Sequence, residues 1–135
     1  MHKFILATLF YCGLSFTPAF ATEVEQPENR CLRVYSITGF TYIDEYHALL
    51  AGRTKKENYL VRFRRTCRDL NFASQITTSF EHQLVCRPVI EHIRTEHDRC
   101  PVDGIQMVSG REEARSIAAT RAAKRQQTNK TESDS

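Results

Sequence analysis

The sequence predicts a small, mainly β domain, with five to seven short strands in a barrel-like or curled sheet and one C-terminal helix. Three observations predict this class. A secretory signal pattern opens the 135-residue chain, four widely spaced cysteines follow it, and short strand-like segments separated by turns precede an alanine-rich end. A chain of this length is enough for one domain.

The N-terminal segment Met1–Ala21 has the layout of a secretory signal peptide. His2 and Lys3 precede an apolar run, and small residues close the segment before Thr22. We therefore expect cleavage after Ala21 and a periplasmic or secreted protein without membrane insertion after cleavage. A retained N-terminal anchor is the alternative, although the apolar run is shorter than the roughly 20 residues that span a membrane.

The charge balance argues against two classes of partner. The formal net charge of the chain is +3, which is too close to neutral to predict a nucleic acid or an anionic membrane as the partner. A domain this small buries a limited share of its surface and needs additional stabilisation. Two disulfides would each contribute roughly 2–4 kcal/mol.

The pattern after the signal segment indicates a flexible leader and then a β-rich domain. Residues 22–30 are polar and contain Pro27, whereas residues 31–109 alternate short apolar runs with turn residues. The strand candidates, in chain order, are 32–37, 40–43, 47–51, 59–64, 72–80 and 102–108. Residues 65–71 are expected to form a loop.

The clearest strand signal lies in residues 59–64. Tyr59, Val61 and Phe63 alternate with basic residues, so the apolar side chains should face the core while the arginines face water. A solvated strand face explains the arginines, and a docking patch for an acidic partner is the functional alternative. The candidate patch consists of Arg62, Arg64, Arg65 and Arg68.

The end of the domain predicts a helix over residues 110–125. Ser109 followed by Glu112 fits a capping box. An apolar stripe at helical spacing should dock weakly on the β domain or fray. The stripe consists of Ala114, Ile117, Ala118 and Ala122. Residues 126–135 contain no apolar side chain and are expected to be disordered.

The four cysteines after the signal segment are expected to form two disulfides, because an exported protein meets an oxidising environment. Three pairings are possible. We expect Cys67–Cys86, which would close a local β excursion, and Cys31–Cys100, which would join the first strand to the last. The spacings contain no tight pair of the kind that a zinc site needs, so no metal is expected.

The sequence contains no nucleophile elbow, zinc-protease motif or phosphate-binding glycine loop. We therefore expect no catalytic residue and no cofactor. Two alternatives stay open. A small envelope hydrolase or isomerase would gather Asp44, His47 or His92 in a concave site with perturbed titration. A redox or metal-handling protein would have reactive thiols.

The cysteine framework also resembles a known family. The residues that carry the resemblance are Cys31-Leu32, Ile37, Asp44, Tyr59, Cys67, Leu70, Ala73, Cys86, Cys100 and Ile105. They are similar to a group of small secreted Gram-negative bacterial proteins known as a domain of unknown function. The resemblance covers about residues 31–114 and implies a compact, disulfide-bonded, exported domain, with no catalytic residue to transfer.

The expected role is a non-enzymatic binding or structural module of the cell envelope that displays a rigid β surface. Its partner would be an unidentified envelope component, with the arginine patch as the candidate contact. The oligomeric state does not follow from the sequence.

Overall fold

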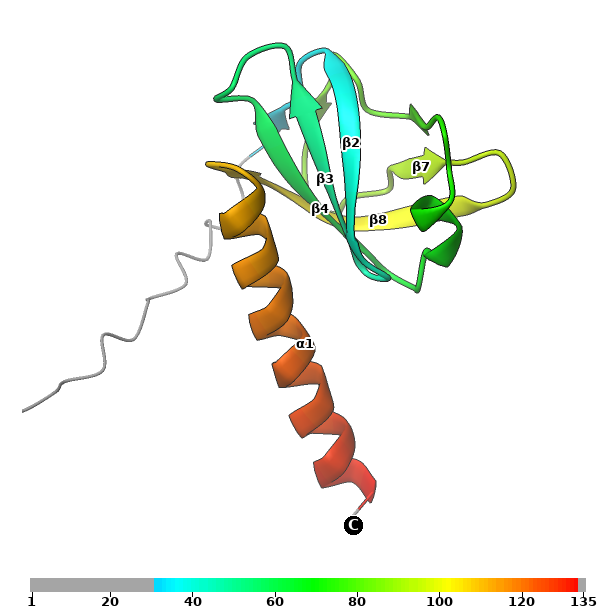
Figure 1. The fold of residues 1–135 in the computed structure, drawn as a ribbon, viewed down its shortest axis with the longest axis vertical. Helices are drawn as coiled ribbons and strands as arrows, with labels where there is room; N and C mark the ends of the chain where they lie inside the picture. Colours follow the sequence, from blue (N-terminus) through cyan, green and yellow to red (C-terminus); the bar gives the residue numbers. More distant parts are fainter. Residues whose placement is uncertain (1–30, 134–135) are drawn as a thin grey trace, which may run out of the picture.

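The computed structural model describes residues 31–133, which form a curled β-sheet and one long helix (Figure 1). The predicted signal peptide and leader lie outside the described residues. The elements are β1 (Leu32–Arg33), β2 (Ile37–Asp44), β3 (His47–Gly52), β4 (Asn58–Phe63), the 3-10 helix η1 (Arg68–Asn71), β5 (Thr77–Thr78), β6 (Leu84–Val85), β7 (His92–Arg94), β8 (Arg99–Val108) and α1 (Arg111–Ser133).

Six strands form one antiparallel sheet in the order β2-β3-β4-β8-β7-β5, and β1 pairs with β6 in a separate ribbon. The sheet curls into a half-barrel, so that its two edge strands, β2 and β5, do not pair with each other. The expected class, a mainly β curled sheet followed by a C-terminal helix, is confirmed. Within residues 31–133, no helix is both long and apolar enough to span a membrane.

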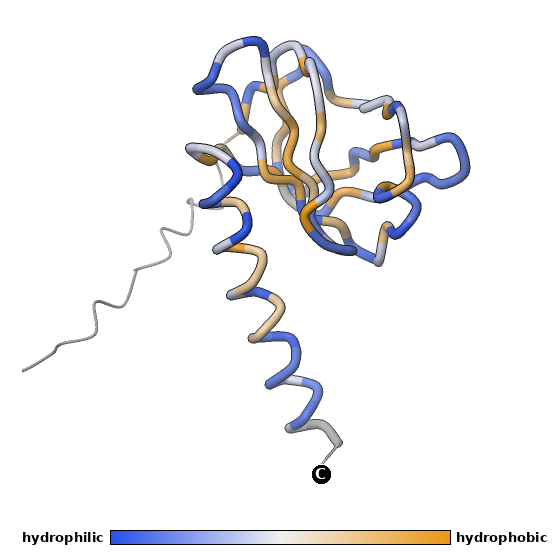
Figure 2. The backbone as a smooth tube through the Cα atoms, viewed as in Figure 1, coloured by the Kyte–Doolittle hydropathy of each residue, from blue (hydrophilic) through white to orange (hydrophobic). Residues whose placement is uncertain are grey.

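The concave face of the sheet holds the main core. Tyr59, Val61 and Phe63 are buried there as their alternation predicts, and Leu50 and Phe80 pack into the same cluster. Figure 2 shows the hydrophobic residues concentrated along the strands and hydrophilic residues at the loops between them. The alternation works because successive strand residues point to opposite faces.

The convex face carries a smaller core that α1 covers. Leu49, Leu60 and Val108 are buried against Ala114, and Ile117 packs beside them. The predicted stripe therefore docks through small side chains at the start of the helix. Beyond it, the Arg121 side chain donates to Gln106 Oε1 at 2.8 Å, while the Arg125 guanidinium lies 3.9 Å from the centre of the Tyr46 ring.

Two expectations about the helix are wrong. The helix starts at Arg111, so its third residue is Glu113 rather than Glu112, and Glu113 Oε2 accepts from the Ser109 N–H at 2.6 Å. The helix also continues past Arg125 to Ser133, where disorder was predicted. Propagation from a docked first half costs less than starting a helix, and hydroxyl contacts such as Thr128 Oγ1 to the Lys124 carbonyl accompany it.

The disulfide pairing also differs from the expectation. The bonds are Cys31–Cys86 and Cys67–Cys100, not Cys31–Cys100 and Cys67–Cys86. The first strand pairs with β6 rather than with the last strand, and the Leu32↔Val85 register puts Cys31 directly opposite Cys86, with 4.1 Å between their Cα atoms.

The second bond follows from the pairing of β4 with β8. The chain leaving β4 stays beside β8, because the Arg64 N–H donates to the Pro101 carbonyl at 3.0 Å. This course brings Cys67 to Cys100, with 5.7 Å between their Cα atoms.

Several strand boundaries differ from the predicted ones. The first candidate shrinks to β1, and the candidate over residues 72–80 shrinks to β5. Strand β7, at His92–Arg94, was not predicted, because its apolar spacing fits neither period. These segments are short, and their pairing with distant strands decides their conformation.

Candidate functional site

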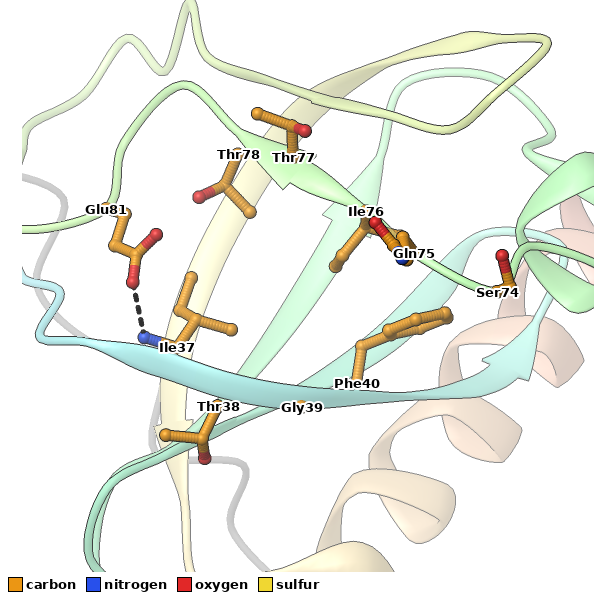
Figure 3. Close-up of a pocket in the computed structure, with 10 residues that line it drawn as sticks. All are labelled: Ile37, Thr38, Gly39, Phe40, Ser74, Gln75, Ile76, Thr77, Thr78 and Glu81. Carbon is orange, nitrogen blue, oxygen red and sulfur yellow. Dashed lines mark hydrogen bonds between the residues drawn. The ribbon is translucent and has the colours of Figure 1, made fainter.

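The open seam between the two edge strands is one concave feature of the described residues. A cavity of about 640 Å³ lies there, between β2 and the segment that contains β5. Cavities of this size are typical of small-ligand sites. Its lining consists of Ile37, Thr38, Gly39, Phe40, Ser74, Gln75, Ile76, Thr77, Thr78 and Glu81. In Figure 3 the Ile37, Phe40 and Ile76 side chains point into the space between the two segments.

A bulge in β2 gives the seam its apolar wall. The register shifts between Ile37 and Gly39, leaving Thr38 as an extra residue. Because of this insertion, Ile37 and Phe40 both pack toward the main core, although an odd separation would place them on opposite faces of a regular strand. The Thr38 hydroxyl holds the bulge by donating to the Gly52 carbonyl at 2.9 Å.

Several backbone groups on the outer edge of β2 have no strand partner among residues 31–133. The Phe63 N–H donates to the Tyr46 carbonyl at 2.8 Å, which makes these two residues a hydrogen-bonded pair of the β3–β4 ladder. Alternation along the antiparallel ladders then directs the backbone groups of Thr41 toward β3. The N–H and C=O groups of Phe40 and Tyr42 consequently point away from β3, at the outer edge of the sheet. Phe40 lines the seam cavity, and Tyr42 lies further along the same edge.

The same reasoning applies to β5. The Ser79 N–H donates to the His92 carbonyl at 3.1 Å, so this pair and the Thr77↔Arg94 pair direct their backbone groups between β5 and β7. Thr78 lies between them, and its backbone groups point away from β7. The Thr78 hydroxyl is buried and has no hydrogen-bond partner among the described residues.

One carboxylate lines the seam. Glu81 Oε1 accepts a hydrogen bond from the Ile37 N–H at 2.9 Å, and the dashed line in Figure 3 marks this contact. The lining residues include no lysine, arginine or histidine. The seam therefore combines apolar side chains, hydroxyl groups, free backbone groups and one negative charge.

The four predicted patch arginines lie near β4 and just after it, but each contacts a carboxylate of this chain. Arg62 lies 2.7 Å from Asp103, and Arg64 lies 4.0 Å from the same side chain. Arg64 also donates to the Val89 carbonyl. The single carboxylate of Asp103, on the neighbouring strand β8, thus opposes two arginine charges and offsets only part of their sum.

The other two arginines are paired in the same way. Arg65 lies 2.8 Å from Asp98, and its hydrogen bond lowers the pKa of that carboxyl. Arg68 lies 3.0 Å from Glu45. The four side chains share a region of the surface, but they do not form a field of unopposed positive charge.

Of the three residues that the sequence suggested for a hydrolase site, Asp44 and His47 lie next to each other. Nδ1 of His47 lies 2.9 Å from Asp44 Oδ1, and its Nε2 is buried without a hydrogen-bond partner among the described residues. The side chain of His47 is fully buried. Burial lowers its pKa, the hydrogen bond to Asp44 opposes that shift, and the Arg121 and Arg125 cations add to it.

His92 does not join this pair. Its Nδ1 lies 3.1 Å from an Arg99 nitrogen on the neighbouring strand. The enclosed His47 imidazole lines no part of the seam cavity, so the structure does not bring the three residues of the predicted hydrolase site into that concave feature.

A group of potential metal ligands surrounds one disulfide. Ligand atoms of Cys67, Asp98 and Cys100 lie within 4.8 Å of one another. The two sulfur atoms are bonded to each other, so this cluster would offer thiolate ligands only after reduction.

Sequence reasoning did not find the seam. Its walls come from residues 37–40 and 74–81, which are distant in the chain, and only the sheet order places them opposite each other. The glycine after Thr38, inside a strand-like run, was the local signal, because such a glycine often marks a bulge.

The fold and the seam define a small disulfide-bonded β domain: a half-barrel sheet, open along one side and braced by a helix on its convex face. Residues 4–128 match the model of a family of unknown function, DUF6491, and the chain belongs to that family. The resemblance to a domain of unknown function is thereby confirmed. No curated protein and no solved structure matches the chain.

Proposed function

We propose that the protein is an exported, non-enzymatic binding module of the cell envelope, and that the seam between β2 and β5 is its binding site. The observation that carries the proposal is the cavity of about 640 Å³ between two strand edges that pair with no other strand in the part of the chain that the structure describes. Apolar side chains there would bury ligand surface, and the free backbone groups would orient the ligand.

Export is supported by two independent features. The signal pattern of Met1–Ala21 predicts translocation, and disulfides such as Cys31–Cys86 persist in oxidising compartments. Cell fractionation followed by N-terminal sequencing tests this part of the proposal. The expected product is an extracytoplasmic protein that starts at Thr22, whereas a cytoplasmic protein that retains Met1 would contradict it.

A binding role is favoured over a hydrolytic one by the position of the acid–histidine pair. The His47 side chain is fully buried, which leaves its imidazole no access to a substrate in this conformation. The seam, in contrast, is open and lined by groups suited to holding a ligand.

The seam is tested with a variant that fills it. The chain from Thr22 onward is immobilised as wild type, as Ile76→Trp, which places a large ring in the cavity, and as Ile90→Trp, a control at a side chain that is 81% exposed. Each is exposed to solubilised envelope fractions, and the retained material is quantified. We expect Ile76→Trp to lose the retained material and Ile90→Trp to keep it.

A triple variant of Arg62, Arg64 and Arg65 to Glu separates the seam from the arginine patch. Retention should survive this change because the three arginines lie outside the seam lining, and Asp103 and Asp98 partly oppose their charges. Equal retention by Ile76→Trp and wild type would overturn the seam as the site. Loss in the triple variant alone would transfer the site to the arginine patch.

A further inference from the structure

We propose that the seam binds an extended polypeptide segment that carries a basic residue, which adds a strand between β2 and β5 and completes the half-barrel. This inference rests on the proposed function, because it names the ligand class of the same site. Strand addition uses main-chain hydrogen bonds for affinity and side-chain pockets for specificity.

The backbone geometry is the first argument. Phe40 and Tyr42 present N–H and C=O groups on the free edge of β2, and Thr78 presents them on the free edge of β5. A strand inserted between them would satisfy both rows. Such edges attract another strand unless they are covered.

The direction of the added strand follows from the sheet order. Every neighbouring pair in the six-stranded sheet is antiparallel, so β2 and β5 run in opposite directions. One inserted strand must therefore be parallel to one of them. Since β2 spans eight residues and β5 spans two, we infer that it runs antiparallel to β2, the longer edge.

Charge selects the occupant. Among the described residues that line the cavity, Glu81 is the only one with a charged side chain, and it lies at the Ile37 end of β2. A segment antiparallel to β2 would bring its C-terminal end to this carboxylate, so a lysine or arginine at that end is complementary to it.

Two occupants from this chain fit the charge less well. The leader, residues 22–30, contains three glutamates and one basic residue, Arg30, so its net charge is −2. Arg30 directly precedes Cys31, which is bonded to Cys86 outside the cavity lining. The β2 strand of a second copy contains no basic residue and ends at Asp44. Both segments carry a net negative charge, which is unfavourable next to Glu81. A basic segment of another protein is therefore the occupant to which the inference commits.

The experiment uses the chain from Thr22 onward and a synthetic peptide, acetyl-Thr-Val-Thr-Val-Thr-Val-Lys-amide. Three control peptides carry Glu in place of Lys, N-methyl groups on alternate amides, or the leader sequence of residues 22–30. Affinity is measured by calorimetry, and amide hydrogen exchange is followed by NMR.

The lysine peptide is expected to slow exchange about tenfold or more at the Phe40, Tyr42 and Thr78 amides, which point away from the strands that pair with β2 and β5. The Thr41 amide, already directed to β3, should change little. N-methylation should abolish binding, and the Glu peptide should bind about tenfold more weakly, as expected for the loss of one ion pair and the gain of like charge. Glu81→Gln should remove that preference, while Glu112→Gln, at a side chain that is 90% exposed on α1, should preserve it.

Each of the other possible outcomes would contradict one part of the proposal. Equal binding of the N-methylated peptide excludes strand addition. Tighter binding of the leader peptide assigns the seam to this chain, and a concentration-dependent dimer that protects the same amides assigns it to a second copy. If no peptide binds but Ile76→Trp still abolishes retention of envelope material, strand addition fails and the proposed binding role stands.

Discussion

At the scale of single residues, three buried side-chain polar atoms of residues 31–133 lack a hydrogen-bond partner, and two of them have direct consequences for stability. The third, Arg62 Nε, belongs to a side chain that is paired with Asp103 through another of its nitrogen atoms. Nε2 of His47 and the hydroxyl of Thr78 are enclosed without a hydrogen-bond partner among residues 31–133. A buried polar group that lacks a partner costs about 1–3 kcal/mol. The His47 atom belongs to the acid–histidine pair, and Thr78 lines the seam.

His47 should make stability fall as the pH falls. Its pKa in the folded protein is lowered, chiefly by burial, so the unfolded chain binds a proton more readily than the folded one. Because the unfolded state gains the proton first, the free energy of unfolding decreases as the pH drops through about 6.5. Denaturant titrations between about pH 5 and pH 8 measure this slope.

The matched variants isolate the contribution of His47. His47→Gln should flatten the slope, whereas His82→Gln, at a side chain that is 68% exposed, should leave it unchanged. An identical slope in His47→Gln and wild type would contradict the assignment to His47.

Thr78→Val should leave the protein at least as stable as wild type. The substitution removes a buried hydroxyl that has no partner among the described residues, and we expect the free energy of unfolding to rise by about 1 kcal/mol. Thr77→Val, at the exposed neighbouring position, serves as the control and should change stability by less than about 0.5 kcal/mol. Thermal unfolding measures both, and a clear loss in Thr78→Val would show that the hydroxyl is satisfied.

At the scale of the element, the first half of α1 is part of the domain. Ala114 is fully buried and Ala118 is 2% exposed against the convex face of the sheet. In Figure 2 the helix passes from mixed and hydrophobic residues near the sheet to hydrophilic residues toward its end. The small side chains permit close approach of the helix to Leu49 and Leu60.

A large charged side chain at the docked face should therefore separate the helix from the sheet. Ala114→Arg is expected to lower the free energy of unfolding by about 3 kcal/mol, because it overfills a packed contact and buries a charge. Ala123→Arg, at an exposed position of the same helix, should have little effect. Urea denaturation compares the two, and equal values would show that the helix contributes no packing.

At the scale of the whole molecule, each disulfide joins two segments that are far apart in the sequence. Cys31–Cys86 ties the β1–β6 ribbon together across a separation of 55 residues, and Cys67–Cys100 joins the chain after β4 to β8 across 33 residues. Crosslinks over loops of this length restrict the unfolded chain and contribute about 4 kcal/mol each.

Replacing either cysteine pair with alanine should lower the free energy of unfolding by roughly 4 kcal/mol, and losing both should leave the domain poorly folded. The double variants are C31A with C86A and C67A with C100A. Peptide mapping without reductant should recover the two observed pairs. A reduced protein with undiminished thermal stability would contradict this account.

The sequence alone determined the features that depend on local period and composition. These are the mainly β class, the inward face of Tyr59, Val61 and Phe63, and the apolar stripe of α1. Alternation along a strand and spacing along a helix are physical properties of neighbouring residues, so a short window of sequence is enough to read them.

Only the tertiary structure decided the cysteine pairing, the last turns of α1 and the open seam. Cys31 meets Cys86 because Leu32 pairs with Val85, and the seam exists because the sheet order leaves β2 and β5 unpaired at its edges. Both depend on which distant strands pair and in which register. Several pairings satisfy the same local pattern, and the burial of one common core selects among them.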